Sequence, residues 1–158
     1  MEHGRTPEAL IDRQDITDLI FAYCDHFDRG EAEEVIGLFA EDAVIDYGPD
    51  VPTMTGPAEF GPMIRRGLDE FFAATSHHVS NVTVRFVGPD DATSMCYLYA
   101  WHRYREDRPE SELWGRYEHR FRRTTSGWRI TRLVLKSAGT RAFHRERMHP
   151  IGRKPGRI

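Results

Sequence analysis

The segment Phe21-Ala22-Tyr23-Cys24-Asp25-His26-Phe27-Asp28-Arg29-Gly30 has the pattern of the end of a long N-terminal helix, and the rest of the chain is interpreted from it. Residues four apart in a helix lie one turn above another, so Tyr23, Phe27 and the neighbourhood of Asp28 share a face. Asp28 therefore lies at the edge of an apolar face, just before a helix-stop signal. Its carboxylate either projects into whatever that face covers or caps a second helix that begins near Glu31.

The composition is that of one globular domain. The chain has 158 residues, of which 39% are hydrophobic and 30% charged. We expect a single domain over residues 1–158, with a core at about 7–139 and a basic C-terminal tail at 140–158. No apolar run reaches the ~20 residues of a membrane span, and the polar N-terminus lacks a signal sequence. These features predict a cytoplasmic protein with no membrane partner.

Charge is unevenly distributed, although the formal net charge is only −3. Residues 25–50 are acidic, and the segment after Thr140 is basic. A basic tail can indicate nucleic-acid binding, but this one is short and holds only Phe143 to stack a base, so no nucleic-acid partner is predicted. We expect the tail to be solvated, or to pack on the acidic segment of its own or a neighbouring subunit. Cys24 and Cys96 have neither metal-site nor disulfide spacing and are interpreted as buried apolar residues.

Helical signals dominate the first half of the chain. Thr6-Pro7-Glu8 combines an N-cap residue, a proline and an acid at a helix start. Apolar residues then recur with helical spacing up to Gly30. The pattern further predicts a short helix at 31–40, a short strand at 43–47, a loop at 50–57 and a third helix at about 57–74.

From Ser76 onward, apolar and polar residues alternate with the period of a half-buried strand. Further long strands are predicted at 92–105, 112–123 and 128–137, with a hairpin turn between the last two. The fold class is therefore α+β, with three N-terminal helices packed on a strongly curved antiparallel sheet to form a cone-shaped α+β barrel. The interior of such a cone suits an apolar small molecule.

Two histidines begin the first long strand and are candidates for acid–base chemistry. Adjacent strand residues point to opposite faces, so at most one of His77 and His78 points inward. A histidine becomes an effective base when a carboxylate fixes its tautomer, and Asp28 is the best candidate for that carboxylate. The alternative is that His77 hydrogen-bonds a loop carbonyl. No paired ligand spacing indicates zinc or iron, so no metal is predicted.

The other candidates for a substrate pocket come mainly from the aromatic strands. Aromatic residues are favoured in strands, so core packing explains them as well as a pocket does. A phenol inside a pocket can nevertheless donate a hydrogen bond to a substrate carbonyl. Whether His102 or His119 faces the pocket is left open. The pocket candidates are Phe27, Tyr47, Asn81, Tyr97, Tyr99, His102, Trp114, Tyr117 and His119.

Three segments resemble the SnoaL-like members of the nuclear transport factor 2-like superfamily. They are ITDLIFAYCDHFDRGEAEEVIGLF at 16–39, SHHVSN at 76–81 and WGRYEHRFRRTTSGWRI at 114–130. Dehydratase-type members carry a Tyr-x4-Asp pattern at the end of the first helix and a His at the start of the first long strand, which Tyr23, Asp28 and His77 match. The resemblance implies a cofactor-independent lyase in which His77 abstracts a proton, Asp28 orients His77, and Tyr23 hydrogen-bonds the carbonyl or the departing hydroxyl.

The resemblance also implies the substrate, the assembly and the alternatives. The expected substrate is an apolar cyclic or polycyclic small molecule. The same pair, Asp28 and His77, could catalyse an isomerisation or a polyketide cyclisation instead. The alternative from another class is a non-catalytic assembly subunit, such as the small subunit of a ring-hydroxylating dioxygenase. Family members are commonly homo-oligomers, so we expect a dimer or trimer packed sheet against sheet. The apolar sheet surface that a partner would cover is expected to include Tyr97, Tyr99, Trp101 and Trp128.

Overall fold

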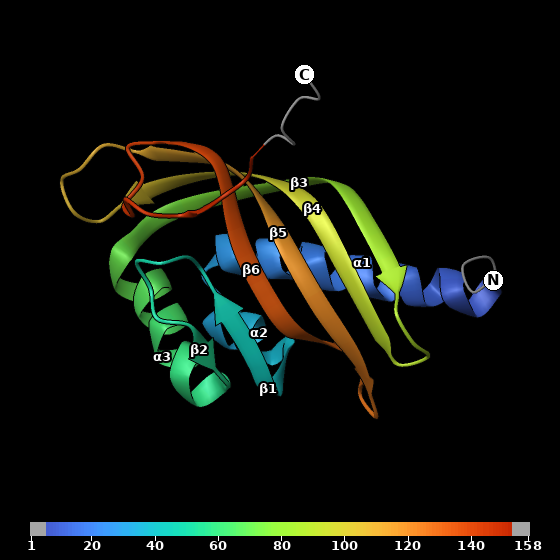
Figure 1. Cartoon of the computed structure of the whole chain (residues 1–158). Helices are drawn as coiled ribbons and strands as arrows, with labels where there is room; N and C mark the ends of the chain where they lie inside the picture. The colour runs from blue at the N-terminus through green and yellow to red at the C-terminus, as the bar shows by residue number, and fades with distance from the viewer. Residues whose placement is uncertain (1–5, 153–158) are drawn as a thin grey trace, which may run out of the picture.

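The computed structural model describes residues 6–152, which form helices packed against a mixed sheet (Figure 1). Helix α1 crosses one face of the sheet, and α2 and α3 lie beside β1 and β2. No helix in this part of the chain is long and apolar enough to cross a membrane. The helices are α1 (Pro7–Arg29), α2 (Ala32–Gly37), α3 (Pro57–Arg66) and the π-helical turn η1 (Gly67–Phe71). The strands are β1 (Phe39–Asp46), β2 (Met54–Thr55), β3 (Phe72–Phe86), β4 (Asp91–Tyr104), β5 (Ser111–Thr124), β6 (Gly127–Arg141) and β7 (His149–Pro150).

The strand order is β2-β1-β6-β5-β4-β3, with β7 paired to β6. The four long strands pair antiparallel, as predicted. β1 and β7 pair with β6 in parallel, so the prediction of a purely antiparallel sheet is wrong. A parallel pair needs a long crossover connection, which strand periodicity does not reveal. Within residues 6–152 no pairing joins the end strands β2 and β3, so the structure shows a mixed sheet, whereas the predicted strong curvature and cone-shaped barrel are not shown.

Helix α1 begins and ends at the predicted signals. The Ala9 N–H donates to Thr6 Oγ1 at 3.2 Å, which satisfies one unpaired donor of the first turn. At the other end Gly30 adopts φ +73°, a left-handed conformation that glycine accepts without steric cost. Helix α2 has Glu31 at its N-cap, with no side-chain capping bond. Asp28 is therefore the penultimate residue of α1, and the capping alternative is wrong.

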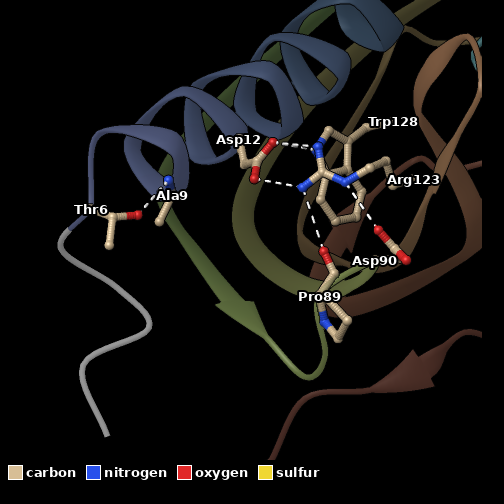
Figure 2. A network of polar contacts seen from close by, with 7 residues as sticks. All are labelled: Thr6, Ala9, Asp12, Pro89, Asp90, Arg123 and Trp128. Carbon is tan, nitrogen blue, oxygen red and sulfur yellow. Dashed lines mark hydrogen bonds and ion pairs between the residues drawn. The ribbon is translucent and has the colours of Figure 1, made fainter.

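The N-terminal half of α1 is fastened to the sheet by one polar network (Figure 2). Arg123 on β5 donates to both oxygens of Asp12, at 2.8 and 2.6 Å. Trp128 on β6 donates its indole N–H to the same carboxylate at 3.0 Å. Arg123 also contacts Asp90 at 3.2 Å, in the turn between β3 and β4. Helix, turn and two strands are thus held together at the end of the molecule that lies near the N-terminus.

Several element boundaries differ from prediction. The third helix ends early, because the π-helical turn 67–71 follows it and β3 already begins at Phe72. Strand β1 starts at Phe39 and not at Ala43, and β2 lies in the predicted loop. Trp128, predicted to contribute apolar surface to a partner, is buried under α1 with 3% exposure.

The C-terminal segment packs on the acidic segment of its own chain, which is one of the two predicted alternatives. Asp50 accepts from the backbone N–H groups of Glu146 and Arg147 and pairs with the Arg147 side chain at 2.6 Å. His149 Nε2 lies 2.8 Å from Asp46 Oδ1. Phe143 and other residues of this segment pack against the core, so the core extends beyond residue 139. The end of the predicted tail, 153–158, lies outside the described residues.

Candidate active site

The side chains of Asp28 and His77 meet at the C-terminal end of α1. His77 Nδ1 lies 2.6 Å from Asp28 Oδ1, and the His77 backbone N–H donates to Oδ2 at 2.7 Å. Thr75 Oγ1 donates to Oδ1 at 2.7 Å. Because an ionised carboxylate only accepts, Nδ1 carries the hydrogen in the neutral imidazole, and the lone pair of that form is on Nε2. The predicted contact between Asp28 and His77 is confirmed, whereas their chemical roles stay predictions.

The sequence positions both members of this pair by local geometry. Asp28 is one residue from the end of α1, where the helix reaches the start of β3. His77 lies opposite the buried Ala100 of β4, and its side chain is only 5% exposed. His78 lies opposite Tyr99, on the other face, and is exposed. The alternation of the strand therefore directs His77, and not His78, toward α1.

Opposing effects set the pKa of Asp28. Burial raises the pKa of this carboxyl, because it disfavours the charged form. The hydrogen bonds from the His77 side chain and backbone, the charge of His77 and the bond from Thr75 lower it, and together they outweigh burial. The pKa of Asp28 therefore lies below its ordinary value. The carboxylate is ionised at neutral pH and can stabilise a protonated His77.

A cavity of about 60 Å³ lies beside the pair. Tyr23 and Tyr47 contribute two hydroxyl groups that lie 2.6 Å apart. The ring of Tyr117 contacts the ring of Tyr23 edge-on at 5.6 Å. Burial raises the pKa of Tyr23 and of Tyr47, so both phenols remain protonated donors. The apolar walls include Phe27, Phe72, Leu98, Leu113 and Leu135.

Two further histidines line the cavity in the neutral form. Burial, followed by the charges of His77 and Arg145, lowers the pKa of His102 to about 3. Burial, followed by the charge of Arg145, lowers the pKa of His144 to about 3. The His102 ring meets the His77 ring edge-on at 5.6 Å. Of His102 and His119, it is therefore His102 that faces the cavity, where it can donate or accept a hydrogen bond without carrying charge.

The structure brings six of the predicted residues together with His77. The cavity is lined by His77 itself and by Tyr23, Phe27, Tyr47, His102 and Tyr117. Asp28 reaches the cavity through its bond to His77.

Five predicted pocket residues do not line this cavity. Tyr97 and Trp114 lie on the outer face of the sheet, with 42% and 40% exposure. Tyr99 lies on the same outer face, where its hydroxyl donates to Glu112 at 2.8 Å. Alternation in a strand separates two faces but does not tell which of them is inside, so this assignment failed. The homo-oligomer that was expected to pack through these aromatic residues stays a prediction.

The other two misplaced residues lie on β3 and β5. Asn81 is exposed at a bulge of β3, where it adopts φ +51°. His119 is buried, but it packs between Tyr117 and Phe121, and its Nδ1 lies 3.0 Å from Ser94 Oγ. The alternation of β5 places the His119 side chain on the inner face, like that of Tyr117. His119 is two residues farther along the strand, however, and lies beyond the cavity.

The cavity residues that the sequence analysis missed include three consecutive ones, Phe143, His144 and Arg145. They belong to the segment predicted as a solvated or surface-packed tail. It has no regular periodicity, because it runs as irregular chain between β6 and β7. The signal that could have identified it is Phe143, a large apolar residue within an otherwise basic stretch.

Comparison with known proteins gives one family and many similar structures. Residues 8–134 match the SnoaL-like domain. A proposed scytalone dehydratase from Novosphingobium aromaticivorans shares 32% identity and a TM-score of 0.86, over 92% of this chain and 97% of that one. A proposed aromatic ring hydroxylase from Novosphingobium aromaticivorans shares 27% identity and a TM-score of 0.75, over 80% and 88%. A hexachlorocyclohexane dehydrochlorinase from Novosphingobium barchaimii shares 15% identity and a TM-score of 0.76, over 90% and 97%, which shows the fold alone. No curated protein sequence matches the chain.

Proposed function

The chain belongs to the SnoaL-like domain family, and from that premise we propose that it is a cofactor-independent lyase of the dehydratase type. Its structural neighbours include a proposed dehydratase and a dehydrochlorinase. The observation that carries the proposal is the 2.6 Å contact between Asp28 and His77 at the wall of an apolar cavity. A non-catalytic assembly subunit would need neither the contact nor the cavity.

The proposed reaction begins with proton transfer to His77. Nε2 takes a proton from a carbon next to a substrate carbonyl, while Nδ1–H remains bonded to Asp28. The electron pair of the broken C–H bond forms the new C=C bond as the C–O bond to the leaving hydroxyl breaks. Protonated His77 then returns its proton to the departing hydroxide, which leaves as water. Atoms and charge balance, so no cofactor is needed.

The hydroxyl groups of Tyr23 and Tyr47 are proposed to bind the substrate carbonyl. Two phenols 2.6 Å apart cannot both donate to one another, so at least one hydroxyl hydrogen is available for an acceptor in the cavity. A donor aimed at the carbonyl oxygen stabilises the negative charge that develops there when the proton leaves. This role assists His77 and leaves the proton path unchanged.

The proposed substrate is an apolar cyclic or polycyclic compound. Apolar side chains form most of the walls, which favours burial of a ring over binding of a polar chain. The cavity volume of about 60 Å³ is smaller than the ~150 Å³ of an apolar cavity that accepts benzene. A cyclic substrate therefore enters only when part of the wall moves outward.

The test is conversion of a panel of cyclic β-hydroxy ketones, each with and without a ring carboxylate, by wild type, His77→Ala and His78→Ala, in deuterated water. We expect wild type to release water and form the conjugated ketone, seen by ultraviolet absorbance and by mass. His77→Ala should lose at least about 10²-fold in rate, and His78→Ala is the matched control on the outer face. Deuterium uptake with double-bond migration and no water loss would identify an isomerase. No conversion or deuteration by wild type above His77→Ala would refute the proposal.

A further inference from the structure

Arg145 is a cation in the wall of the cavity, and it has no anionic partner. Its Nη1 donates to the Tyr47 backbone carbonyl at 3.0 Å. Its guanidinium carbon lies 5.3 Å from the Tyr47 ring centroid and 5.7 Å from that of Phe143. No ion pair joins Arg145 to a carboxylate within residues 6–152, and the groups whose charges act on it are phenols. Burial lowers the pKa of Arg145, but a guanidinium stays protonated in proteins.

The neighbouring arginines of the same part of the chain are paired. Arg141 contacts Glu112 at 2.8 Å, and Arg147 contacts Asp50 at 2.6 Å. Both of these side chains are more than 70% exposed, so water also solvates them. Arg145 instead lines the cavity and is only partly exposed. A partly buried cation without a carboxylate partner is a candidate site for an anionic ligand.

The groups around the cavity do not supply the missing anion. Both oxygens of Asp28 are already engaged, by the side chains of Thr75 and His77 and by the His77 backbone. His102 and His144 are neutral, because burial lowers the pKa of each to about 3. The phenols are protonated, because burial raises their pKa values. An anionic partner for Arg145 would therefore have to come from a ligand.

We propose that Arg145 binds a carboxylate of the substrate, so that the cavity takes an apolar cyclic acid and not a neutral ring compound. The planar guanidinium fork matches a carboxylate with two parallel hydrogen bonds. The segment that carries it is held on both sides, by the end of β6 and by Asp50, which binds the N–H groups of the two residues that follow. The carboxylate at Arg145 then fixes one end of the ring, and the remainder extends to His77. For its reaction, though not for binding, this inference rests on the proposed function.

The test is calorimetric titration of the full chain with benzoate and cyclohexanecarboxylate, and with the two corresponding neutral amides, in buffer free of carboxylate and phosphate. Wild type should prefer the acids. Arg145→Met should weaken acid binding at least about tenfold and change amide binding less than about twofold. The affinity of Arg145→Lys for the acids should lie between those of wild type and Arg145→Met, because lysine keeps the charge but lacks the planar guanidinium fork. Arg141→Gln removes the same charge from a side chain that is 74% exposed and is the matched control.

Two kinds of result would overturn this inference. The first is a wild type without preference for the acids, whether both probes bind equally or neither binds. The second is an Arg145→Met variant that weakens the binding of acids and amides alike, which would make Arg145 a packing residue. Thermal unfolding of each variant accompanies the titration, and Arg145→Lys replaces Arg145→Met if the latter fails to fold.

His77→Ala separates the carboxylate site from the proposed reaction. It should still bind the acids, because Arg145 is intact. Acid binding that depends on Arg145, together with turnover that does not depend on His77, would remove the proposed reaction and keep the carboxylate site. Turnover that depends on His77, without a preference for acids in binding, would remove the carboxylate site and keep the proposed reaction.

Discussion

Helix α1 carries two aspartates that bind the sheet, Asp12 near its start and Asp28 near its end. Asp12 accepts two bonds from Arg123 and one from Trp128, away from the cavity that His77 lines (Figure 2). Asp28 accepts from His77 and Thr75, at the cavity wall. Hydrogen bonds lower the pKa of both carboxyls. A lowered carboxyl pKa is thus no mark of catalysis by itself, and the distinguishing feature is the partner: arginine stays charged, whereas histidine exchanges a proton near neutral pH.

Replacing each aspartate with asparagine should give the largest contrast. Asp28→Asn should lower kcat by about 10²–10⁴-fold, because an amide cannot stabilise the imidazolium and can select the wrong tautomer. Asp12→Asn should leave kcat within about twofold, because Asp12 contacts no cavity group. Turnover is measured together with thermal unfolding. Equal losses of turnover in both variants would mean that the two ends of α1 do not differ in function.

Tyr23→Phe should have a smaller effect at the cavity end. It removes one hydrogen bond to Tyr47 and leaves the proton path through His77 in place. A net hydrogen bond is worth about 0.5–1.5 kcal/mol, so kcat should fall about two- to tenfold. Steady-state kinetics on the same substrate measure this. A loss as large as that of Asp28→Asn would assign the proton transfer to the phenol and not to the imidazole.

A double-mutant cycle should measure the coupling at the other end of α1. Asp12→Ala, Arg123→Ala and the double variant are compared by urea unfolding. Because the Arg123 side chain is 38% exposed, water screens the pair, and we expect a coupling of about 0.5–1 kcal/mol. Turnover should be unaffected throughout. A coupling near zero would mean that the ion pair between Asp12 and Arg123 does not help to hold α1 on the sheet.

The smallest of the expected effects is the loss of folding stability at Asp12 when the pH is lowered. The pKa of Asp12 is lowered in the folded state, with the hydrogen bond from Arg123 as the largest cause. A carboxyl with a lowered folded-state pKa stabilises the fold above its unfolded pKa of about 3.9 and loses that contribution as the pH falls through the folded value. Wild type should therefore lose a few tenths of a kcal/mol more than Asp12→Asn as the pH drops below about 4. Parallel unfolding profiles over this range would contradict the assignment.

Local signals in the sequence predicted the elements that depend on local structure. The N-cap at Thr6 and the stop at Gly30 bound α1 because capping is decided within one turn. Asp28 and His77 could be paired in advance because a helix end and a strand start have defined directions, and because three residues matched the dehydratase pattern. The parallel pairing of β1 with β6 depends on segments far apart in sequence and has no local signature.

The pocket was predicted only in part, for two physical reasons. Strand alternation sorted Tyr97, Tyr99 and Trp114 onto one face but did not tell that this face is the outer one. Arg145 enters the cavity on irregular chain, which has neither helical nor strand periodicity. Its position is decided by anchors elsewhere, among them Asp50 in the acidic segment. Composition shows that such basic and acidic segments attract one another, but not which side chain faces inward.

The parallel pairing of β1 with β6 also bears on the order of events when the chain is made. β1 leaves the ribosome early, yet its buried residue Ile45 pairs with Leu133, which is synthesised near the end. Contacts between such distant segments form slowly, and apolar strands without a partner are prone to aggregate meanwhile. Arg145 follows later still, so a nascent chain that already holds Asp28 and His77 has no finished cavity around them. A chain whose synthesis stops before β6 would hold Asp28 and His77 without Leu135, Phe143, His144 and Arg145, which complete the cavity.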